Sequence, residues 1–441
     1  MRWLTAKGTQ RENHTPQAQQ LALEKIENPG SAGRGDDIPS AGTKMIYAKN
    51  WGQKVLSRRE FIAKGTGTAV TVAAAASTGL LAGCANSAAS PPPTVSSFHD
   101  LAGPRSLRAH ARRHGLIYGS AVVIPAVQKN ADFASLLSEQ CGILVPSNEL
   151  KWVALRPSRD AFNFGPPDFL YDFTQRNQML MRGHTLCWHE SVPAWIRKID
   201  NKDEIKQIFV DHITTVCKHY AGKLHSWDVV NEAIDPNGKL PGGLRKSFWY
   251  ENLGPDYIDL AFHTARAADA NVKLTYNDYG VEVDNDGDAE KRRLILEMVK
   301  GMKSRGVPID AVGIQSHLNA GLKYGRGVAD YIEAFHQLGL EVFLTELDVN
   351  DDETVSSDLA ERDAIIARTY TDFLTAALPN PAVKIVLTWD LSDRFTWLNG
   401  IGSHRKKQPD RSQRPLPFDT DFKPKDCFYA LRDSFDRRKR A

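Results

Sequence analysis

The sequence predicts an α/β protein whose body is a single closed (β/α)8 barrel, the TIM barrel, preceded by an N-terminal leader. Two observations favour this fold. From about residue 105 onward, short apolar or β-branched segments alternate with amphipathic segments, which is the pattern of βαβ units in a parallel sheet. Polar residues also recur at the carboxyl ends of the expected strands, where barrel proteins build their sites.

Eight strands are expected, at Leu116–Val123, Ile143–Asn148, Met179–Leu186, Leu224–Asn231, Val272–Asn277, Ala311–Gln315, Glu341–Leu347 and Lys384–Trp389. The segments between them predict helices, among them Lys206–His219, Tyr257–Ala270, Ala289–Arg305 and Ala360–Ala377. An open doubly wound sheet is the alternative architecture. Because no glycine-rich phosphate loop follows the first strand, the dinucleotide-binding form of that alternative is disfavoured.

The composition is that of an ordinary soluble globular protein, with 41% hydrophobic and 25% charged residues in 441. The net charge of +3 gives no indication of a nucleic-acid partner, and we expect a monomer. The five cysteines are Cys84, Cys141, Cys187, Cys217 and Cys427. They are too few for a disulfide scaffold and show no metal-binding spacing, so they indicate no metal site.

The N-terminal region has the features of an export leader. Residues 1–44 are polar and without periodicity, so they are either disordered or upstream of a true start at Met45. Within 45–89, Arg58 and Arg59 precede an apolar stretch that is too short to span a bilayer. This arrangement resembles a twin-arginine signal, and we expect the twin-arginine machinery to export the protein.

Cys84 is a candidate for lipidation because Leu81–Cys84 resembles a lipobox. Simple cleavage after this point is the alternative. The expected destination is therefore the periplasm, the cell surface as a lipoprotein anchored to the membrane, or the medium. Residues 90–104 are interpreted as a linker, 105–432 as the barrel domain and 433–441 as a basic tail.

Seven of the eight expected strands end in polar or aromatic side chains that could share one rim of the barrel. They are Asn148, His184, Asn231, Glu232, Asn277, Asp278, Gln315, His317, Glu346 and Trp389. A single polar residue at a strand end is usually a cap or a turn former. Repetition around the barrel instead predicts an active site.

Two of these residues, Glu232 and Glu346, form the pair of carboxyl groups that a glycosidase needs. They are 114 positions apart, but a barrel can bring the fourth and seventh strands together across its mouth. A retaining enzyme holds the two groups about 5–5.5 Å apart, and an inverting enzyme about 6.5–9.5 Å apart. We expect His317 to keep Glu346 ionised, and the charge of Glu346 to raise the pKa of Glu232 so that it holds a proton. Asn231 could bond the 2-hydroxyl of the sugar.

Several motifs occur in a fixed order along residues 105–432, namely Tyr118-Gly119-Ser120-Ala121, Asn148 with Lys151-Trp152, Arg182 to Leu186 with Trp188-His189, Trp227 to Ala233, Tyr276 to Tyr279, Gln315-Ser316-His317 and Thr345 to Asp348. In this the sequence resembles glycoside hydrolase family 10, the retaining β-1,4-xylanases. The resemblance implies an endo-1,4-β-xylanase that hydrolyses internal bonds of a β-1,4-linked polysaccharide by double displacement. Glu232 would be the acid/base and Glu346 the nucleophile. Because this mechanism needs neither a metal nor an organic cofactor, neither is expected.

The resemblance also implies a set of sugar-binding residues. These are Asn148, Lys151, His184, Trp188, Asn231, Gln315, His317, Trp389 and Trp397. Tyr279 could flank the leaving-group side.

Three positions depart from the family pattern. Ser147 replaces a usual glutamate, Glu190 follows Trp188-His189 where a serine is usual, and Asp390 replaces a usual glycine. These changes leave open a glycanase for another β-1,4-linked polysaccharide or exopolysaccharide. A sugar-binding lipoprotein without activity is a further alternative, against which the presence of both glutamates, Asn231 and His317 argues.

Overall fold

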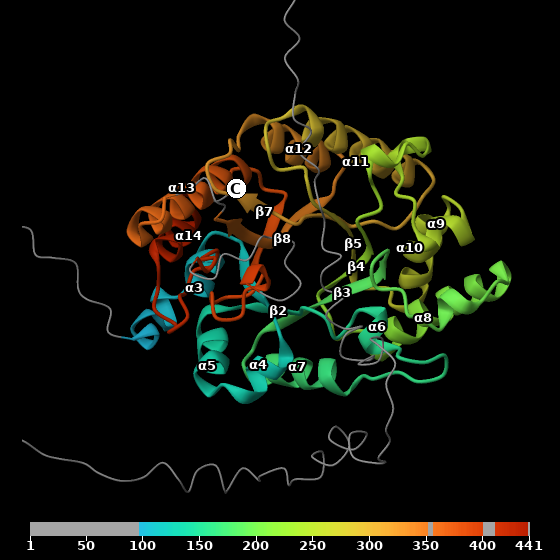
Figure 1. Ribbon diagram of the computed structural model, residues 1–441, viewed down its shortest axis with the longest axis horizontal. Helices are drawn as coiled ribbons and strands as arrows, with labels where there is room; N and C mark the ends of the chain where they lie inside the picture. The colour runs from blue at the N-terminus through green and yellow to red at the C-terminus, as the bar shows by residue number, and fades with distance from the viewer. Residues whose placement is uncertain (1–96, 352–355, 400–410, 440–441) are drawn as a thin grey trace, which may run out of the picture. The chain divides into compact units, whose positions relative to one another are not determined.

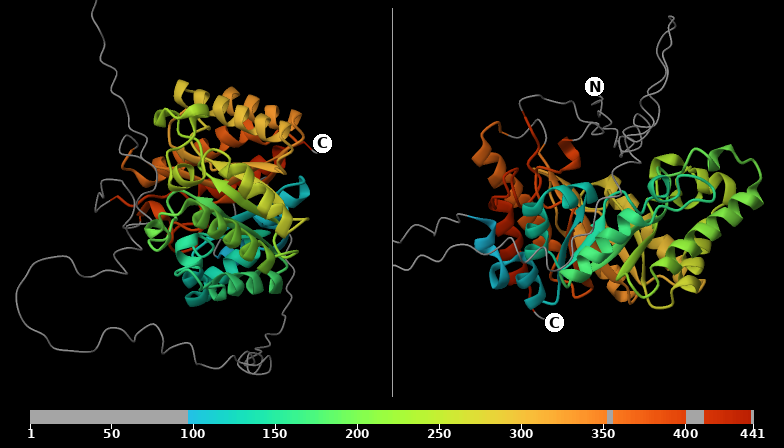
Figure 2. Two further views of the ribbon diagram at one scale, coloured as in Figure 1. Left: turned by 90° about the vertical axis from the view of Figure 1, so that its right-hand side faces the viewer. Right: turned by 90° about the horizontal axis from the view of Figure 1, so that it is seen from below.

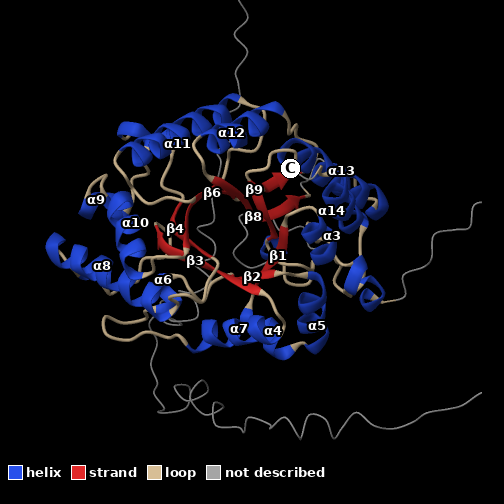
Figure 3. Cartoon of the chain, turned by 180° about the vertical axis from the view of Figure 1, so that it is seen from behind, coloured by secondary structure: helices blue, strands red, loops and turns tan. Residues whose placement is uncertain are grey.

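The computed structural model describes residues 97–351, 356–399 and 411–439. The expected leader, the twin-arginine pair and Cys84 lie outside these residues. Eight parallel strands form the centre of the described part, surrounded by helices (Figures 1 and 3). The strands are β1 (Ile117–Val122), β2 (Ile143–Pro146), β3 (Leu180–Trp188), β4 (Ser226–Asn231), β5 (Lys273–Asp278), β6 (Ala311–Ile314), β8 (Glu341–Asn350) and β9 (Val383–Thr388).

The sheet closes on itself, which confirms the barrel and excludes the open alternative. Strands β1 to β6 pair in chain order, β6 pairs with β8, β8 with β9, and β9 with β1. A short additional strand, β7 (His317–Asn319), follows β6 after a break and pairs with the last residues of β8. All of these pairs are parallel, so the carboxyl ends of the strands meet at one rim.

Helices cover the outside of the barrel (Figure 2). The α-helices are α3 (Leu107–Arg113), α4 (Ile124–Lys129), α5 (Ala131–Gln140), α6 (Trp152–Leu155), α7 (Gly165–Arg176), α8 (Lys202–His219), α9 (Phe248–Leu253), α10 (Tyr257–Ala268), α11 (Asp286–Ser304), α12 (Arg326–Gln337), α13 (Leu359–Ala377) and α14 (Asp426–Arg437). Short 3-10 helices lie at η1 (Phe98–Leu101), η2 (Gly103–Arg105), η3 (Ile196–Lys198), η4 (Pro236–Gly238), η5 (Pro241–Gly243) and η6 (Trp397–Asn399).

Side-chain caps explain where the long helices begin. Asn201 accepts hydrogen bonds from the second and third N–H groups of α8, Asn285 caps α11, and Asp358 caps α13. Each supplies an acceptor to backbone donors that have no partner within the helix. Because of these caps, α8 begins four residues and α11 three residues before the helices that the apolar periodicity predicts.

Two hydrophobic clusters hold the barrel. The inner one fills the barrel itself and consists of Ala121, Ile143, Val145, Ala311, Phe343, Ile385, Leu387 and Trp389. The larger outer cluster packs the other face of the strands against the helices. Burial of each large apolar side chain contributes about 1.5–3 kcal/mol. Trp389, which directly follows β9, is the member of the inner cluster at the carboxyl ends of the strands.

All eight expected strands are present, and the limits of the domain differ from those expected. Leu101 in η1 is buried in the core, so the end of the expected linker already belongs to the domain. At the other end, α14 continues to Arg437 with Phe435 fully buried. The first residues of the expected basic tail are thus part of a packed helix, because its apolar stripe contacts the barrel.

The four cysteines of the described chain, Cys141, Cys187, Cys217 and Cys427, are buried and unbridged. Within the described ranges, no helix has the length and apolar character needed to cross a membrane. No group of three or more His, Cys, Asp or Glu side chains that could hold a metal ion occurs among those residues.

Candidate active site

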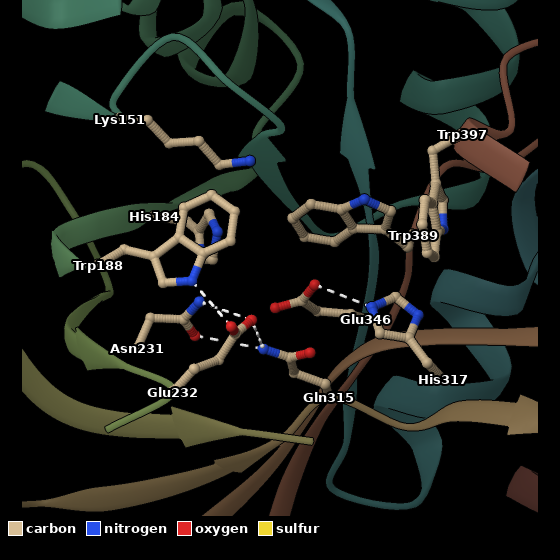
Figure 4. A pocket seen from close by; sticks show the side chains of 10 residues that line it. All are labelled: Lys151, His184, Trp188, Asn231, Glu232, Gln315, His317, Glu346, Trp389 and Trp397. Atoms are coloured by element: carbon tan, nitrogen blue, oxygen red, sulfur yellow. Dashed lines mark hydrogen bonds and ion pairs between the residues drawn. The ribbon is translucent and has the colours of Figure 1, made fainter. Parts of the chain in front are cut away.

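A pocket opens at the carboxyl ends of the strands and contains both glutamates (Figure 4). Its walls come from six of the eight barrel strands or the segments that follow them. The lining residues are Lys151, His184, Trp188, Asn231, Glu232, Gln315, His317, Glu346, Trp389 and Trp397. The structure thus brings together ten of the twelve residues expected from the sequence.

Glu232 directly follows β4 in the left-handed region of backbone conformation, with φ of 59°. Its backbone N–H donates to the carbonyl of Asn277 on the neighbouring strand at 2.9 Å. Its carboxylate accepts hydrogen bonds from Trp188 Nε1 at 2.9 Å, Gln315 Nε2 at 3.0 Å and Asn231 Nδ2 at 3.2 Å. The side chain is 2% exposed, so its environment is set by these donors.

The expectation that Glu232 has a raised pKa is wrong for the protein without a sugar in the pocket. Burial raises the pKa of Glu232, but the charges of His189 and Arg245 and the donors Gln315 and Trp188 outweigh burial, and the pKa lies below its ordinary value. His189 Nδ1 is 3.8 Å from the carboxylate. The expectation considers only the repulsion from Glu346, whereas the neighbouring hydrogen-bond donors and cations decide whether the pKa of Glu232 is raised or lowered.

Glu346 lies in the middle of β8 (Glu341–Asn350) and is held by two donors. Asn277 Nδ2 donates to Oε1 at 2.8 Å, and His317 Nε2 lies 3.2 Å from Oε2. The other ring nitrogen of His317 lies 2.9 Å from Asp348 Oδ1. The expected contact between His317 and Glu346 is therefore present.

The surroundings of His317 favour the charged form of its ring. Burial lowers the pKa of His317, but Asp348 and Glu346 on either side of the ring outweigh burial and raise the pKa well above its ordinary value. Asp348 is itself oriented by Trp397, whose Nε1 donates to Oδ2 at 2.8 Å. A cation fixed beside Glu346 stabilises the ionised carboxylate that a nucleophile requires.

A chain of amide side chains joins the two glutamates. Asn277 Nδ2 donates both to Glu346 and, at 2.9 Å, to Asn231 Oδ1, while Asn231 Nδ2 donates to Glu232. Thr345 in turn donates to Asn277 Oδ1 at 2.7 Å. The sequence indicates Asn277 as a residue at a strand end but does not by itself give it a role at the glutamates. The register that pairs Asn231 with Asn277 on adjacent strands is the signal that assigns this role.

The segment Gln315–His317 supplies a donor to each glutamate. Gln315 donates to Glu232 and His317 contacts Glu346. Ser316 between them has φ of 64°, and its backbone N–H donates to the buried Glu282 at 2.8 Å. Burial and the charge of Asp288 raise the pKa of Glu282 to about 7.

Lys151 and the aromatic rings form the wall above the carboxylates. Lys151 Nζ lies 4.8 Å from the centre of the Trp188 ring and 6.0 Å from that of Trp389, and it donates to Asn148 Oδ1 at 3.2 Å. Burial lowers the pKa of Lys151 to about 8, although Glu346 and Glu232 favour its charged form. Asn148 is thereby linked to the pocket through Lys151.

His184 lines the pocket, whereas Tyr279 lies outside it. His184 Nδ1 lies 2.9 Å from Asp228 Oδ2, and Asp228 is paired with the buried Arg182. Tyr279 is absent from the pocket lining. Its hydroxyl accepts from Arg245 at 3.1 Å, and Lys291 Nζ lies 3.8 Å from its ring centre. Tyr279 therefore lies behind Glu232, whose backbone carbonyl also accepts from Arg245.

The three positions that depart from the family pattern are all buried. Ser147 is 4% exposed, Glu190 is 8% exposed and Asp390 is 2% exposed. Glu190 Oε1 lies 3.6 Å from His189 Nε2. Asp390 has φ of 75°, a conformation that glycine adopts without strain.

Comparison with known proteins agrees with this geometry. The model of glycosyl hydrolase family 10 matches residues 106–434. The chain belongs to this family. Endo-1,4-beta-xylanase B of Thermotoga neapolitana is 33% identical over 319 residues, which are 71% of this chain and 86% of that protein.

Solved structures of other xylanases have the same fold as this family 10 chain. Xylanase 10B from Thermotoga petrophila RKU-1 in complex with xylobiose is 32% identical, with a TM-score of 0.68 over 75% of this chain and 97% of that one. A complex of the intracellular xylanase TsXylA from Thermoanaerobacterium saccharolyticum with xylotetraose is 31% identical, with a TM-score of 0.64 over 74% of this chain and 98% of that one.

Proposed function

We propose that this chain is a retaining endo-1,4-β-xylanase in which Glu346 is the nucleophile and Glu232 the acid/base. The observation that carries this assignment is the different environment of two buried carboxyl groups in one pocket. Glu346 contacts a histidine whose pKa is raised by neighbouring carboxylates, whereas Glu232 accepts three hydrogen bonds from neutral donors, with His189 and Arg245 nearby. Family membership and relatives named as xylanases support the reaction and the substrate.

In the first step Glu346 attacks the anomeric carbon while Glu232 gives its proton to the leaving oxygen. Glu232 must therefore gain a proton when the sugar enters. Sugar hydroxyls that accept hydrogen bonds from Gln315 and Asn231 withdraw these donors from the carboxylate. Burial then weighs more against the remaining charges of His189 and Arg245, and the pKa of Glu232 rises.

In the second step Glu232, now ionised, takes a proton from water, and the water attacks the glycosyl-enzyme. The negative charge on Glu346 is lost while the covalent bond exists, which favours the ionised form of Glu232 at that moment. His317 and Asn277 keep Glu346 in place and stabilise it as the leaving carboxylate. The rings of Trp389 and Trp397 and the Lys151 cation offer the sugar apolar faces and a donor.

Rescue by azide separates the two roles. For an aryl xylobioside, Glu232→Ala with azide should give a β-glycosyl azide, because the anion replaces water on the glycosyl-enzyme. Glu346→Ala with azide should give the α-azide by direct displacement. Without azide, Glu232→Ala should lower kcat on xylan by about 10²–10⁴-fold. Glu297→Ala, at an exposed position on α11, is the control and should behave as the unaltered protein.

The substrate is tested on a panel of β-1,4-linked polysaccharides. We expect reducing ends to be released from xylan. Release from another glycan and none from xylan would contradict the substrate, and no release from any glycan would favour a binding protein.

We further propose that the protein is exported through the twin-arginine pathway and acts outside the cytoplasm as a monomer. The sequence Arg58-Arg59 with its apolar stretch and Cys84 supports this. Replacement of both arginines by lysine should leave the protein in the cytoplasmic fraction, and Cys84→Ala should release a membrane-bound form if the cysteine is lipidated. Light scattering on the purified protein tests the monomer.

A further inference from the structure

A second pocket lies at the amino ends of the strands, on the side of the barrel opposite to the two glutamates. It has a volume of about 540 Å3, and its walls come from η2, α3 and the end of α5. The chain runs from α3 into β1 and from α5 into β2. Because β1 has six residues, each rising by about 3.3 Å, this pocket and the one with the glutamates are separated by roughly 20 Å along the barrel.

Three arginines line this second pocket, namely Arg108, Arg112 and Arg113. Arg112 and Arg113 are exposed, as is Arg105 at the end of η2. Arg108 donates to the backbone carbonyl of Asn177 at 3.3 Å, just before β3, which fixes its guanidinium at the amino ends of the strands. Since arginine is charged at every physiological pH, this side of the barrel carries a permanent positive charge.

The end of α14 adds further cations, because it packs against α3 (Figures 1 and 3). His114 Nδ1 at the end of α3 lies 2.7 Å from the backbone carbonyl oxygen of Arg438. Arg437 and Lys439, on either side of Arg438, are exposed. The basic face is defined here as Arg105, Arg108, Arg112, Arg113, Arg437 and Lys439.

Carboxylates also lie among these cations, but they are fewer. Glu139 Oε1 lies 2.6 Å from His99 Nδ1, and Asp436 Oδ1 lies 2.8 Å from His110 Nδ1. Asp433 is exposed on α14. The six cations of the basic face outnumber these three carboxylates, so the face keeps a net positive charge even when both histidines are neutral.

An apolar side chain is exposed beside the basic face. Leu180, the first residue of β3, is 42% exposed, and the carbonyl of Gln178 just before it accepts from Arg108. Its backbone N–H donates to the carbonyl of Gly142 at 2.9 Å, so the sheet holds it in place. Arginines beside an exposed leucine suit a lipid surface, which attracts cations and takes up apolar side chains. A free anion or an acidic polysaccharide would make no use of the leucine.

The chain that leads to this face comes from Cys84. Ser97, the first described residue, is 13 positions after Cys84, and an extended chain of that length spans at most about 45 Å. The 3-10 helices η1 and η2 follow directly, and Gly103 in η2 lines the second pocket. A lipid on Cys84 would therefore hold the basic face within this distance of a membrane.

We propose that the basic face binds an anionic phospholipid surface, with Arg112 and Arg113 at the phosphates of the headgroups and Leu180 inserted between them. The pocket with the two glutamates then opens away from the membrane, where a polysaccharide can reach it. This inference rests on the proposed export, which brings the chain to a membrane.

The test uses the full chain carrying Cys84→Ala, so that no lipid is attached. Sedimentation with vesicles of equal parts phosphatidylcholine and phosphatidylglycerol should show tighter binding than with phosphatidylcholine alone, and the difference should shrink as salt is added. Replacement of Arg105 and Arg112 by glutamine should weaken binding to the mixed vesicles by about fivefold for each arginine. Leu180→Ser should weaken it as well. Xylan hydrolysis should be unchanged in each variant.

Matched controls come from the segment between β7 and α12, on the carboxyl side of the barrel. Lys323→Gln with Arg326→Gln removes two exposed cations there, and Leu322→Ser removes a leucine that is 40% exposed. Because the leader is the same in every variant, its own affinity for vesicles cancels in the ratios. We expect the controls to bind like the parent chain.

Equal binding to the two kinds of vesicle, or an equal loss in the controls, would overturn the proposal. So would calorimetry that detects binding of inorganic phosphate by a chain that ignores vesicles, since the pocket would then be a site for free anions. A chain that binds the mixed vesicles but is not exported in cells would contradict the export and leave the basic face as a lipid-binding surface.

Discussion

The charge of His317 depends on two carboxylates that lie on opposite edges of its ring. Asp348 and Glu346 are both on β8, and the imidazole lies between them at 2.9 and 3.2 Å. An imidazolium in this position favours the ionised form of Glu346, and it also keeps the ring in one orientation. A substitution at Asp348 should therefore alter the charge beside Glu346 through His317, without removing a contact to the sugar.

At this scale we predict that Asp348→Asn moves the alkaline limb of activity to lower pH. Asp348 helps to raise the pKa of His317, so its neutral analogue should let His317 lose its proton at a lower pH. Lowering the pKa of His317 by one pH unit corresponds to a loss of about 1.4 kcal/mol in the stabilisation of the imidazolium. The pH profile of kcat/KM measures the change. An alkaline limb that stays in place would show that His317 does not govern it.

At the scale of elements, β6 packs so closely against β5 and β8 beneath the site that only glycine fits at position 313. A Cβ atom added to Gly313 on β6 would lie 2.1 Å from Asn277 Oδ1 and 3.1 Å from Thr345 Cγ2. The glycine thus allows β5, β6 and β8 to bring Asn277 against Glu346. The packing of β5, β6 and β8 and the hydrogen bond from Asn277 to Glu346 therefore both depend on the close approach of Gly313 to Asn277.

We predict that Gly313→Ala destabilises the protein by about 1–3 kcal/mol, the usual cost of overpacking, and lowers kcat because Asn277 is displaced. Gly142→Ala is the control, since its Cβ would meet no atom closer than 3.5 Å. Thermal unfolding and steady-state kinetics measure the two effects. A variant that lost stability but kept kcat would separate the strand packing from the orientation of Asn277.

At the scale of the whole molecule, two buried histidines make the fold sensitive to acid. Burial lowers the pKa of His212 well below its ordinary value, and burial with Lys273 and Arg182 lowers that of His225 to about 4. Both are neutral in the folded state, whereas unfolded histidine binds a proton below about pH 6.5. His317 has the opposite sign, because its raised pKa stabilises the fold below pH 6.5 and this stabilisation is lost as the pH rises through the folded value.

We predict that the free energy of unfolding falls as the pH drops from about 6.5 to 4, by up to about 1.4 kcal/mol per pH unit for each of His212 and His225. His212→Phe should flatten this slope, because the ring stacked on Trp152 is replaced by one that cannot be protonated. Urea unfolding at a series of pH values measures it. An unchanged slope would assign the acid sensitivity to other groups.

The sequence predicted the barrel and the presence of Glu232 and Glu346 at its rim because both depend on local patterns. Alternating strands and helices fix the topology, and a polar residue at the end of each strand must face the common rim. Trp188 and Gln315 were expected at the site, but their hydrogen bonds to Glu232 and the contribution of Arg245 could not be predicted, since the three residues come from different units of the barrel. The same holds for Asn277, whose partners become apparent only from the register, and for Tyr279, which the structure places behind Glu232.

Glu232 and Glu346 each take a contact from one three-residue segment, Gln315–His317, and the backbone N–H of its middle residue donates to Glu282. A displacement of this segment carries both contacts with it in the same direction. The separation between the acid and the nucleophile should consequently vary less in time than the position of either one. In glycosidases this separation distinguishes the retaining from the inverting course, so we expect this short segment of backbone to help to keep the stereochemical outcome constant.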